Sequence, residues 1–181
     1  MPQGDQRSVE LDLSDLTYDG HMIANVLHGG LGQLTDGEEG NSNFRQDQHG
    51  LGIRGYDWVG WKSDAFPSEQ SKIEITFKFD ALRNFSSVQL FCNNQFSKEV
   101  RVFSRAEAWF SQDGTSYADN HVKYQYERDT LMELARVVII PLNRRIGRYV
   151  KLVLYFDARW MMISGIHFES GKRFPDYCFP T

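Results

Sequence analysis

A glycine-rich segment near the N-terminus carries the side chains with the clearest potential for chemistry. The segment "HGGLGQLTDGEEG", residues 28–40, contains five glycines together with the amide of Gln33 and the carboxylates of Asp36, Glu38 and Glu39. Ca²⁺ prefers oxygen ligands from carboxylates, amides and the backbone carbonyls of a bent loop, and glycine lets a backbone turn so that carbonyls point inward. The spacing is not that of an EF-hand, so on the residues alone a plain turn is the preferred interpretation.

A second segment, "GYDWVGW" at residues 55–61, places Tyr56, Trp58 and Trp61 between glycines. Clustered aromatic rings can form a ligand platform or a carbohydrate-stacking surface. Large aromatic side chains also fill the space between packed sheets. We predict a core position for Trp61 and leave both interpretations open for Trp58.

Signatures of catalysis are missing from the sequence. It contains no G-x-S-x-G, no phosphate loop, no H-E-x-x-H and no Cys-x-x-Cys. The adjacent Glu38 and Glu39 have poor geometry for acid–base chemistry, and the histidines lack ligand spacing. We therefore predict that the chain is not an enzyme.

Two residue types indicate possible covalent chemistry. Asn84, Phe85 and Ser86 form a glycosylation sequon, which matters if the chain is secreted, and its place after a predicted strand suggests a surface loop. Cys92 lies in an apolar run, where a buried free thiol is expected. A disulfide with Cys178 stays open, because the sequence does not give their separation in space.

Size and charge narrow the class of protein. The 181 residues fit one domain, and the net charge of −4 argues against a general nucleic-acid or anionic-membrane surface. The basic cluster "RRIGR", residues 144–148, is interpreted as a solvated turn between strands. No apolar run approaches the roughly 20 residues of a membrane span, and the start does not resemble a signal peptide. We expect either an intracellular protein or a fragment of a larger one.

The elements that must position these residues are mainly strands. In "KIEITFKFD", residues 72–80, apolar and polar side chains alternate, which indicates a half-buried antiparallel strand. Further strands are predicted at residues 88–91, 100–104, 136–142, 148–156 and 160–168. Gly165 inside the last of these suggests a bulge, and residues 128–136 could form a turn or two of helix. The pattern predicts an all-β antiparallel sandwich or jelly-roll at residues 9–170, with linkers at 1–8 and 171–181.

Six motifs in order carry a resemblance to a known family. They are "TYDG", "GGLGQLTDG", "GYDWVGW", "FKFDALRNFSS", "FCNNQF" and "WMMISGIHF". Together they resemble the discoidin-like domain of the discoidin domain receptors, which are collagen-activated receptor tyrosine kinases. The resemblance runs from about Leu11 to Ser170, and the differences from vertebrate relatives suggest a divergent, invertebrate member.

The resemblance implies a β-sandwich of galactose-binding-like type that holds one Ca²⁺ and carries N-glycans. Such a domain lies between the collagen-binding discoidin domain and the membrane, on the extracellular side of the plasma membrane in a single-pass receptor. Gln33 and Asp36 match calcium ligands of the family. Glu38, Tyr56 and Trp58 match further positions around the ion, some of which are expected to contribute backbone oxygens.

Departures from the family pattern affect the ion site. Ser14 stands where the family has an asparagine ligand, and Ser164-Gly165 stands where it has Ser-Glu. Loss of an anionic oxygen should lower Ca²⁺ affinity. Glu38 could substitute for it if its side chain turns inward.

Other family positions bear on covalent chemistry. The cysteines of the family disulfide correspond to Ala108 and Leu152, so both partners are lost together. Cys92 matches a family cysteine outside that bridge, which favours a free thiol. Asn84 matches a glycosylated position.

The resulting hypothesis is a non-catalytic, calcium-stabilised extracellular domain that supports collagen-dependent activation of a receptor tyrosine kinase. Expected partners are collagen, mainly through a preceding domain, and other receptor copies, but not nucleic acid. The alternative is a stand-alone Ca²⁺-dependent carbohydrate- or lipid-binding discoidin-type module, which would have an exposed Trp58. A glycoside-processing enzyme ranks third.

Overall fold

The computed structural model describes residues 21–23, 26–28, 31–35, 37–46, 57–65 and 71–172. Strands dominate these ranges, and the helices are three short 3₁₀ turns, labelled η. The elements are β1 (His21–Ile23), β2 (Val26–His28), η1 (Gly32–Leu34), β3 (Val59–Lys62), η2 (Ser63–Ala65), β4 (Lys72–Cys92), η3 (Phe96–Lys98), β5 (Arg105–Ser111), β6 (Val122–Gln125), β7 (Arg136–Tyr155) and β8 (Trp160–Lys172). The predicted all-β class is confirmed.

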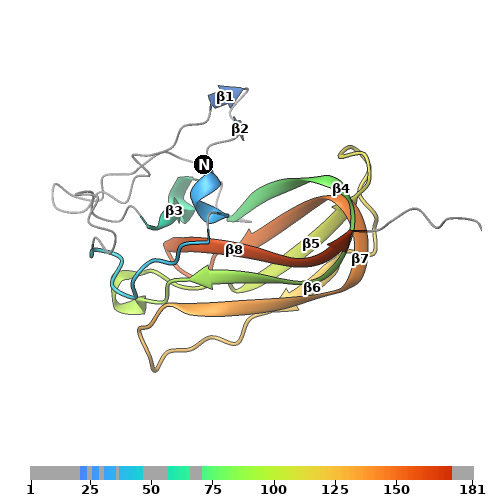
Figure 1. The fold of residues 1–181 in the computed structure, drawn as a ribbon. Helices are drawn as coiled ribbons and strands as arrows, with labels where there is room; N and C mark the ends of the chain where they lie inside the picture. Colours follow the sequence, from blue (N-terminus) through green and yellow to red (C-terminus); the bar gives the residue numbers. More distant parts are fainter. Residues whose placement is uncertain are drawn as a thin grey trace, which may run out of the picture.

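One bent sheet forms both layers of the fold. Its order is β3-β8-β4-β7-β5-β6, and every pairing between neighbours is antiparallel. Residues 72–78 of β4 pair with residues 149–155 of β7, and the same residues of β7 also pair with β5. Residues 83–92 of β4 lie between β7 and β8. Register shifts separate these parts, and Figure 1 shows both long strands curving at one end of the molecule. The bend makes an antiparallel sandwich, as predicted.

The core lies between the two layers and follows the predicted alternation. Ile73 and Ile75 of β4 are buried, whereas Glu74 and Thr76 between and after them are exposed. Residues from every strand of the large sheet join one buried apolar cluster, and Trp61 belongs to it, as predicted. In the described ranges, no helix is long and apolar enough to cross a membrane.

The turn or two of helix considered at residues 128–136 does not form, because side chains there bind the backbone in a different geometry. The Asp129 carboxylate accepts hydrogen bonds from the backbone N–H groups of Leu131 and Met132 at 2.7 and 3.2 Å, and it pairs with Arg136. The Asn94 amide donates to the carbonyls of Asp129 and Met132, both at 3.1 Å. Such side-chain bonds compete with helical hydrogen bonds.

Strand boundaries also differ from the prediction. The strand expected at residues 100–104 is wrong, since Val100 forms only an isolated bridge with Trp160. Two pairs of predicted strands are single long strands, β4 and β7, and the predicted loop around Asn84 is part of β4. The "RRIGR" cluster likewise lies inside β7, next to a local bend where Asn143 and Arg144 have φ near +55°.

Cys92 is a buried free cysteine, which confirms its interpretation. Burial raises the pKa of its thiol far above the ordinary value, so it is neutral and unreactive. Cys178 lies outside the described residues, as do both predicted linkers apart from Gly171 and Lys172, which belong to β8. The proposed linker boundaries therefore stay predictions.

Candidate metal centre

A bulge in β8 aims two consecutive residues at the glycine-rich loop. Phe91 of β4 pairs with Gly165 and Cys92 pairs with Ile163, so Ser164 is the extra residue. A bulge interrupts the alternation of a strand and re-aims its side chains. Ser164 and Gly165 consequently face the same outer side of the sheet. The bulge predicted from Gly165 is confirmed.

Both bulge residues approach the loop closely. The Ser164 hydroxyl oxygen accepts a buried hydrogen bond of 3.0 Å from the backbone N–H of Gly40. A Cβ atom on Gly165 would lie 3.6 Å from the carbonyl oxygen of Glu38 and 3.8 Å from Cγ of Glu39, which is ordinary van der Waals contact. A side chain at position 165 would therefore project toward the loop at residues 38–39.

Trp58 fixes the far end of this loop. Its indole N–H donates to the carbonyl of Asn41 at 3.1 Å, and its ring stacks near Phe91 with centroids 5.6 Å apart. A Cβ atom on Gly40 would lie 2.3 Å from the indole nitrogen, so this contact requires glycine. Trp58 is only 2% exposed. The open question about Trp58 is thus resolved in favour of packing.

Side-chain amides hold the next residue, Ser42, and sequence reasoning missed them. The carbonyl of Ser42 accepts hydrogen bonds from the side-chain amides of Asn93 and Gln95, at 3.0 and 2.9 Å. Its hydroxyl accepts from the backbone N–H of Ala135 at 3.2 Å. The polar run "NNQ" directly after an apolar strand was the available signal. These bonds attach the loop to the end of the sandwich.

Some of the predicted calcium ligands lie in the described part of the chain, and others do not. Gln33 lies in η1, which packs Leu34 into the core, but its side chain is not described. Ser14, Asp36 and Tyr56 lie outside the described residues. Glu38, Trp58 and Ser164 are brought to one region by the loop and the bulge.

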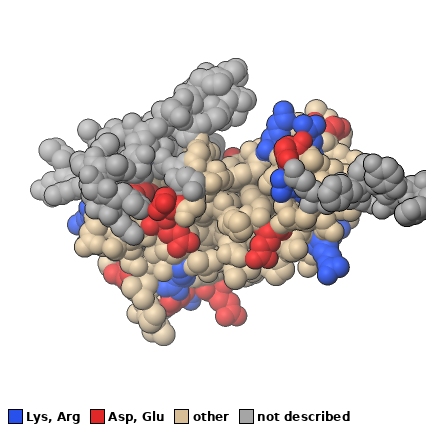
Figure 2. Space-filling view, in the orientation of Figure 1, with Lys and Arg blue, Asp and Glu red and all other residues tan. Residues whose placement is uncertain are grey.

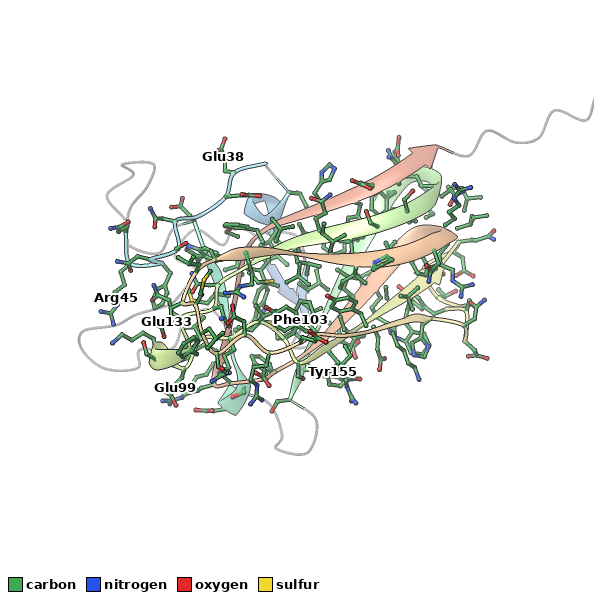
Figure 3. All side chains as sticks on the ribbon, turned by 90° about the horizontal axis from the view of Figure 1, so that it is seen from below. Glu38, Arg45, Glu99, Phe103, Glu133 and Tyr155 are labelled. Carbon is green, nitrogen blue, oxygen red and sulfur yellow. The ribbon has the colours of Figure 1, made fainter. Side chains whose placement is uncertain are left out.

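Glu38 presents its backbone to the sheet. Its carbonyl oxygen faces position 165, whereas Figure 3 shows its side chain pointing away from the sandwich. Among the described residues, no group of three or more His, Cys, Asp or Glu could hold a metal ion. The described oxygens here, the Glu38 carbonyl and the Ser164 hydroxyl, are neutral and of the hard type that suits Ca²⁺. The predicted anionic ligands are Asp36 and a turned Glu38.

Replacing Gly165 with Glu is expected to tighten Ca²⁺ binding by on the order of tenfold, because it adds a carboxylate on the side that faces the loop. The backbone there accepts a Cβ atom without a clash. Gly165→Gln is the matched neutral control and should change the affinity far less. Calorimetric titration with Ca²⁺ measures both variants, and equal affinities for the two would contradict the assignment.

Comparison with known proteins identifies the family. The family described as "Discoidin domain-containing receptor 1/2, DS-like domain" matches residues 1–170. Discoidin domain-containing receptor tyrosine kinase B of Caenorhabditis elegans is 36% identical over 173 residues, which cover 93% of this chain and 20% of that protein. Epithelial discoidin domain-containing receptor 1 of Mus musculus is 34% identical, and the alignment covers 90% of this chain and 18% of the relative.

Solved structures give a more distant likeness. The module CBM32-3 from a family 31 glycoside hydrolase of Clostridium perfringens has a TM-score of 0.48 and 15% identity, covering 63% of this chain and 75% of the module.

The chain spans about a fifth of the length of the curated relatives it matches, and the matched part is their DS-like domain and not a kinase domain. The chain belongs to the DS-like domain family of the discoidin domain-containing receptors.

Proposed function

We propose that the chain is a non-catalytic extracellular domain of a collagen receptor tyrosine kinase, and that it supports collagen-dependent activation of that receptor. The match to the DS-like domain over residues 1–170 carries the proposal. In the whole receptor the domain would lie on the outer side of the plasma membrane. Collagen would bind mainly through a preceding domain, and receptor copies would associate with one another.

Calcium would act as a structural clamp between the loop and β8. The proposed ligands are the side chains of Gln33 and Asp36 and the oxygens offered by Glu38 and Ser164. Ser14 and the backbones of Tyr56 and Trp58 would complete the set. Support comes from the bulge, which places Ser164 and Gly165 against the loop. Because Gly165 provides no carboxylate, the affinity would be lower than in relatives with an acidic residue there.

An N-glycan on Asn84 is also part of the proposal. Asn84 lies inside β4 and not in the loop that we expected, but it is opposite Gly171 of β8. Gly171 has no neighbouring atom within 4 Å of where its Cβ would be, so there is open space beside Gly171, although the side-chain oxygen of Asn84 itself is buried. Digestion with a peptide N-glycosidase followed by mass spectrometry, with Ser86→Ala as the control, tests the attachment.

The alternative function loses its distinguishing feature. A stand-alone carbohydrate-binding module was expected to expose Trp58, but that ring is buried and its N–H is bonded to Asn41. The receptor assignment is therefore the one that we retain.

Receptor activation in cells tests the proposed function. The full-length receptor containing this domain should become tyrosine-phosphorylated on addition of fibrillar collagen. Gly40→Ala, which disturbs the loop, should reduce that response at equal surface expression, whereas Gly32→Ala, which meets no atom within 4 Å, should not. An intact receptor that collagen leaves unphosphorylated would contradict the proposal.

A further inference from the structure

A hollow of about 260 Å³ lies on the outer face of β4 and β8 beside the glycine-rich loop. Its apolar lining is Leu34, Phe91, Val137 and Ile166. The polar residues that line it are Thr35, Glu38, Glu39, Gln89 and His167. Small-molecule sites usually have volumes of about 300–1,000 Å³. The hollow is therefore better suited to one long side chain than to a cofactor.

The missing side chain of Gly165 keeps the hollow open. Gly165 is itself a lining residue, and its Cβ position lies 3.7 Å from Cβ of Phe91 and 3.8 Å from Cγ of Glu39. Any long side chain at this position would project between the apolar lining and Glu39. Glycine at position 165, which lacks the carboxylate of the family pattern, thus also leaves the hollow open.

An apolar strip adjoins the hollow at Val137 and is formed by the start of β7 and the segment that precedes it. We define the strip as Leu131, Met132, Leu134, Val137 and Ile139, which are 45–89% exposed. Among the described strands, residues 136–141 of β7 pair only with β4, so this part of β7 is a sheet edge. Exposed edges usually carry charged residues that prevent association. An exposed apolar strip at an edge is typical of a binding surface.

The charges around the hollow select the kind of partner. None of the described residues that line it is Lys or Arg, whereas Glu39 lines it with its side chain beside Gly165. Glu38 also lines it, but its side chain points away from the sandwich. Glu169 lies nearby and accepts hydrogen bonds from Ser87 at 2.8 Å and from Gln89 at 3.0 Å. Figure 2 shows a face whose centre is largely uncharged, with both acidic and basic side chains around it. A two-fold contact between copies through this face would oppose their acidic groups.

We propose that this face binds an extended polypeptide segment of a partner protein, which places an Arg or Lys side chain in the hollow and an apolar side chain on the strip. A long cationic side chain packs its aliphatic stem on apolar surface and keeps its charged end near polar groups. Phe91 and Val137 would contact the stem, and Glu39 would face the charge. The proposal does not rest on the receptor assignment and does not require bound calcium, but the hollow shares Gly165 with the proposed ion site.

A pair of peptides that differ only in charge tests the proposal. The 181-residue chain is titrated with acetyl-Gly-Val-Arg-Val-Gly-amide and, separately, with the same peptide carrying citrulline, a neutral isostere, in place of Arg. EDTA is present so that no divalent cation competes with the peptide for the carboxylates of the loop. Amide chemical shifts from NMR report binding. The Arg peptide should shift residues around Gln89, Phe91 and Val137 and bind at least fivefold more tightly than the citrulline peptide, with a preference that falls as salt rises.

Variants separate the parts of the surface. Glu39→Gln should reduce the preference for the Arg peptide, and Gly165→Gln, which fills the hollow, should weaken it at least tenfold. Ile139→Ser should weaken both peptides, whereas Glu127→Gln, at an exposed carboxylate that does not line the hollow, should change neither. The proposal would be overturned if 10 mM peptide caused no chemical-shift changes or if the two peptides bound equally well. It would also be overturned if Gly165→Gln bound the Arg peptide as tightly as the wild-type chain. Self-association of the free chain that Ile139→Ser removes would assign the face to a second copy and would also overturn it.

Discussion

Replacing Gly40 with Ala is expected to lower the free energy of unfolding by about 3 kcal/mol, a large loss for a single methyl group. The added Cβ would lie 2.3 Å from the indole nitrogen of Trp58. Either the buried ring or the loop must move. Movement of the loop would break the bond from Trp58 to Asn41 and the bond from Gly40 to Ser164.

Urea denaturation of the wild-type chain and the variant measures this loss. Gly32→Ala is the matched control, because its Cβ would meet nothing within 4 Å, and it should change stability by less than about 0.5 kcal/mol. If Gly40→Ala were as stable as Gly32→Ala, the packing of Trp58 over the loop would be refuted.

A double variant with Ala108→Cys and Leu152→Cys is expected to form a disulfide that stabilises the folded chain by about 4 kcal/mol relative to its own reduced form. Ala108 of β5 and Leu152 of β7 are directly opposed in the antiparallel register, and both are buried. Opposed residues in such strands have Cα atoms about 4.5–5.5 Å apart, within the range of a disulfide. These are the positions at which the family resemblance implies a bridge.

Thermal melts of the oxidised and reduced double variant measure this gain, and comparing one variant with itself removes the cost of losing the leucine side chain. Thiol titration should find two fewer reactive groups after oxidation. Cys92 is buried and should not compete for pairing. A variant that remains reduced under oxidising conditions would show that the register between β5 and β7 is misplaced.

The sequence predicted those parts of the fold where large apolar residues alternate with polar ones. The start of β4 has this pattern, and so does the end of β8 over residues 166–170. In β5 the inward residues include Ala106 and Ala108, and β6 has only four residues, so neither gives a strong periodic signal. The turn or two of helix considered at residues 128–136 does not form because Asp129 and Asn94 bind backbone groups there, and that arrangement depends on tertiary structure.

For the site, local composition indicated the loop and the irregularity at Gly165, but not how they meet. The contact of Gly40 with Ser164 joins residues 124 positions apart, and the bond from Asn93 to Ser42 joins residues 51 apart. Hydrophobic periodicity is a local signal and does not predict which residues far apart in the sequence come into contact. The bulge also gives Ser164 and Gly165 a shared face, which simple alternation would have placed on opposite faces.

The central claim, that Ca²⁺ clamps the glycine-rich loop to β8, is tested most directly by thermal melts of the purified chain in EDTA and in increasing Ca²⁺. Binding to the folded state alone stabilises it by about 2.7 kcal/mol at a hundredfold excess over Kd. We predict a saturable rise in Tm that Asp36→Ala abolishes. No rise in Tm up to millimolar Ca²⁺ would contradict the claim and would mean that Ser14 and Gly165 have disabled the site.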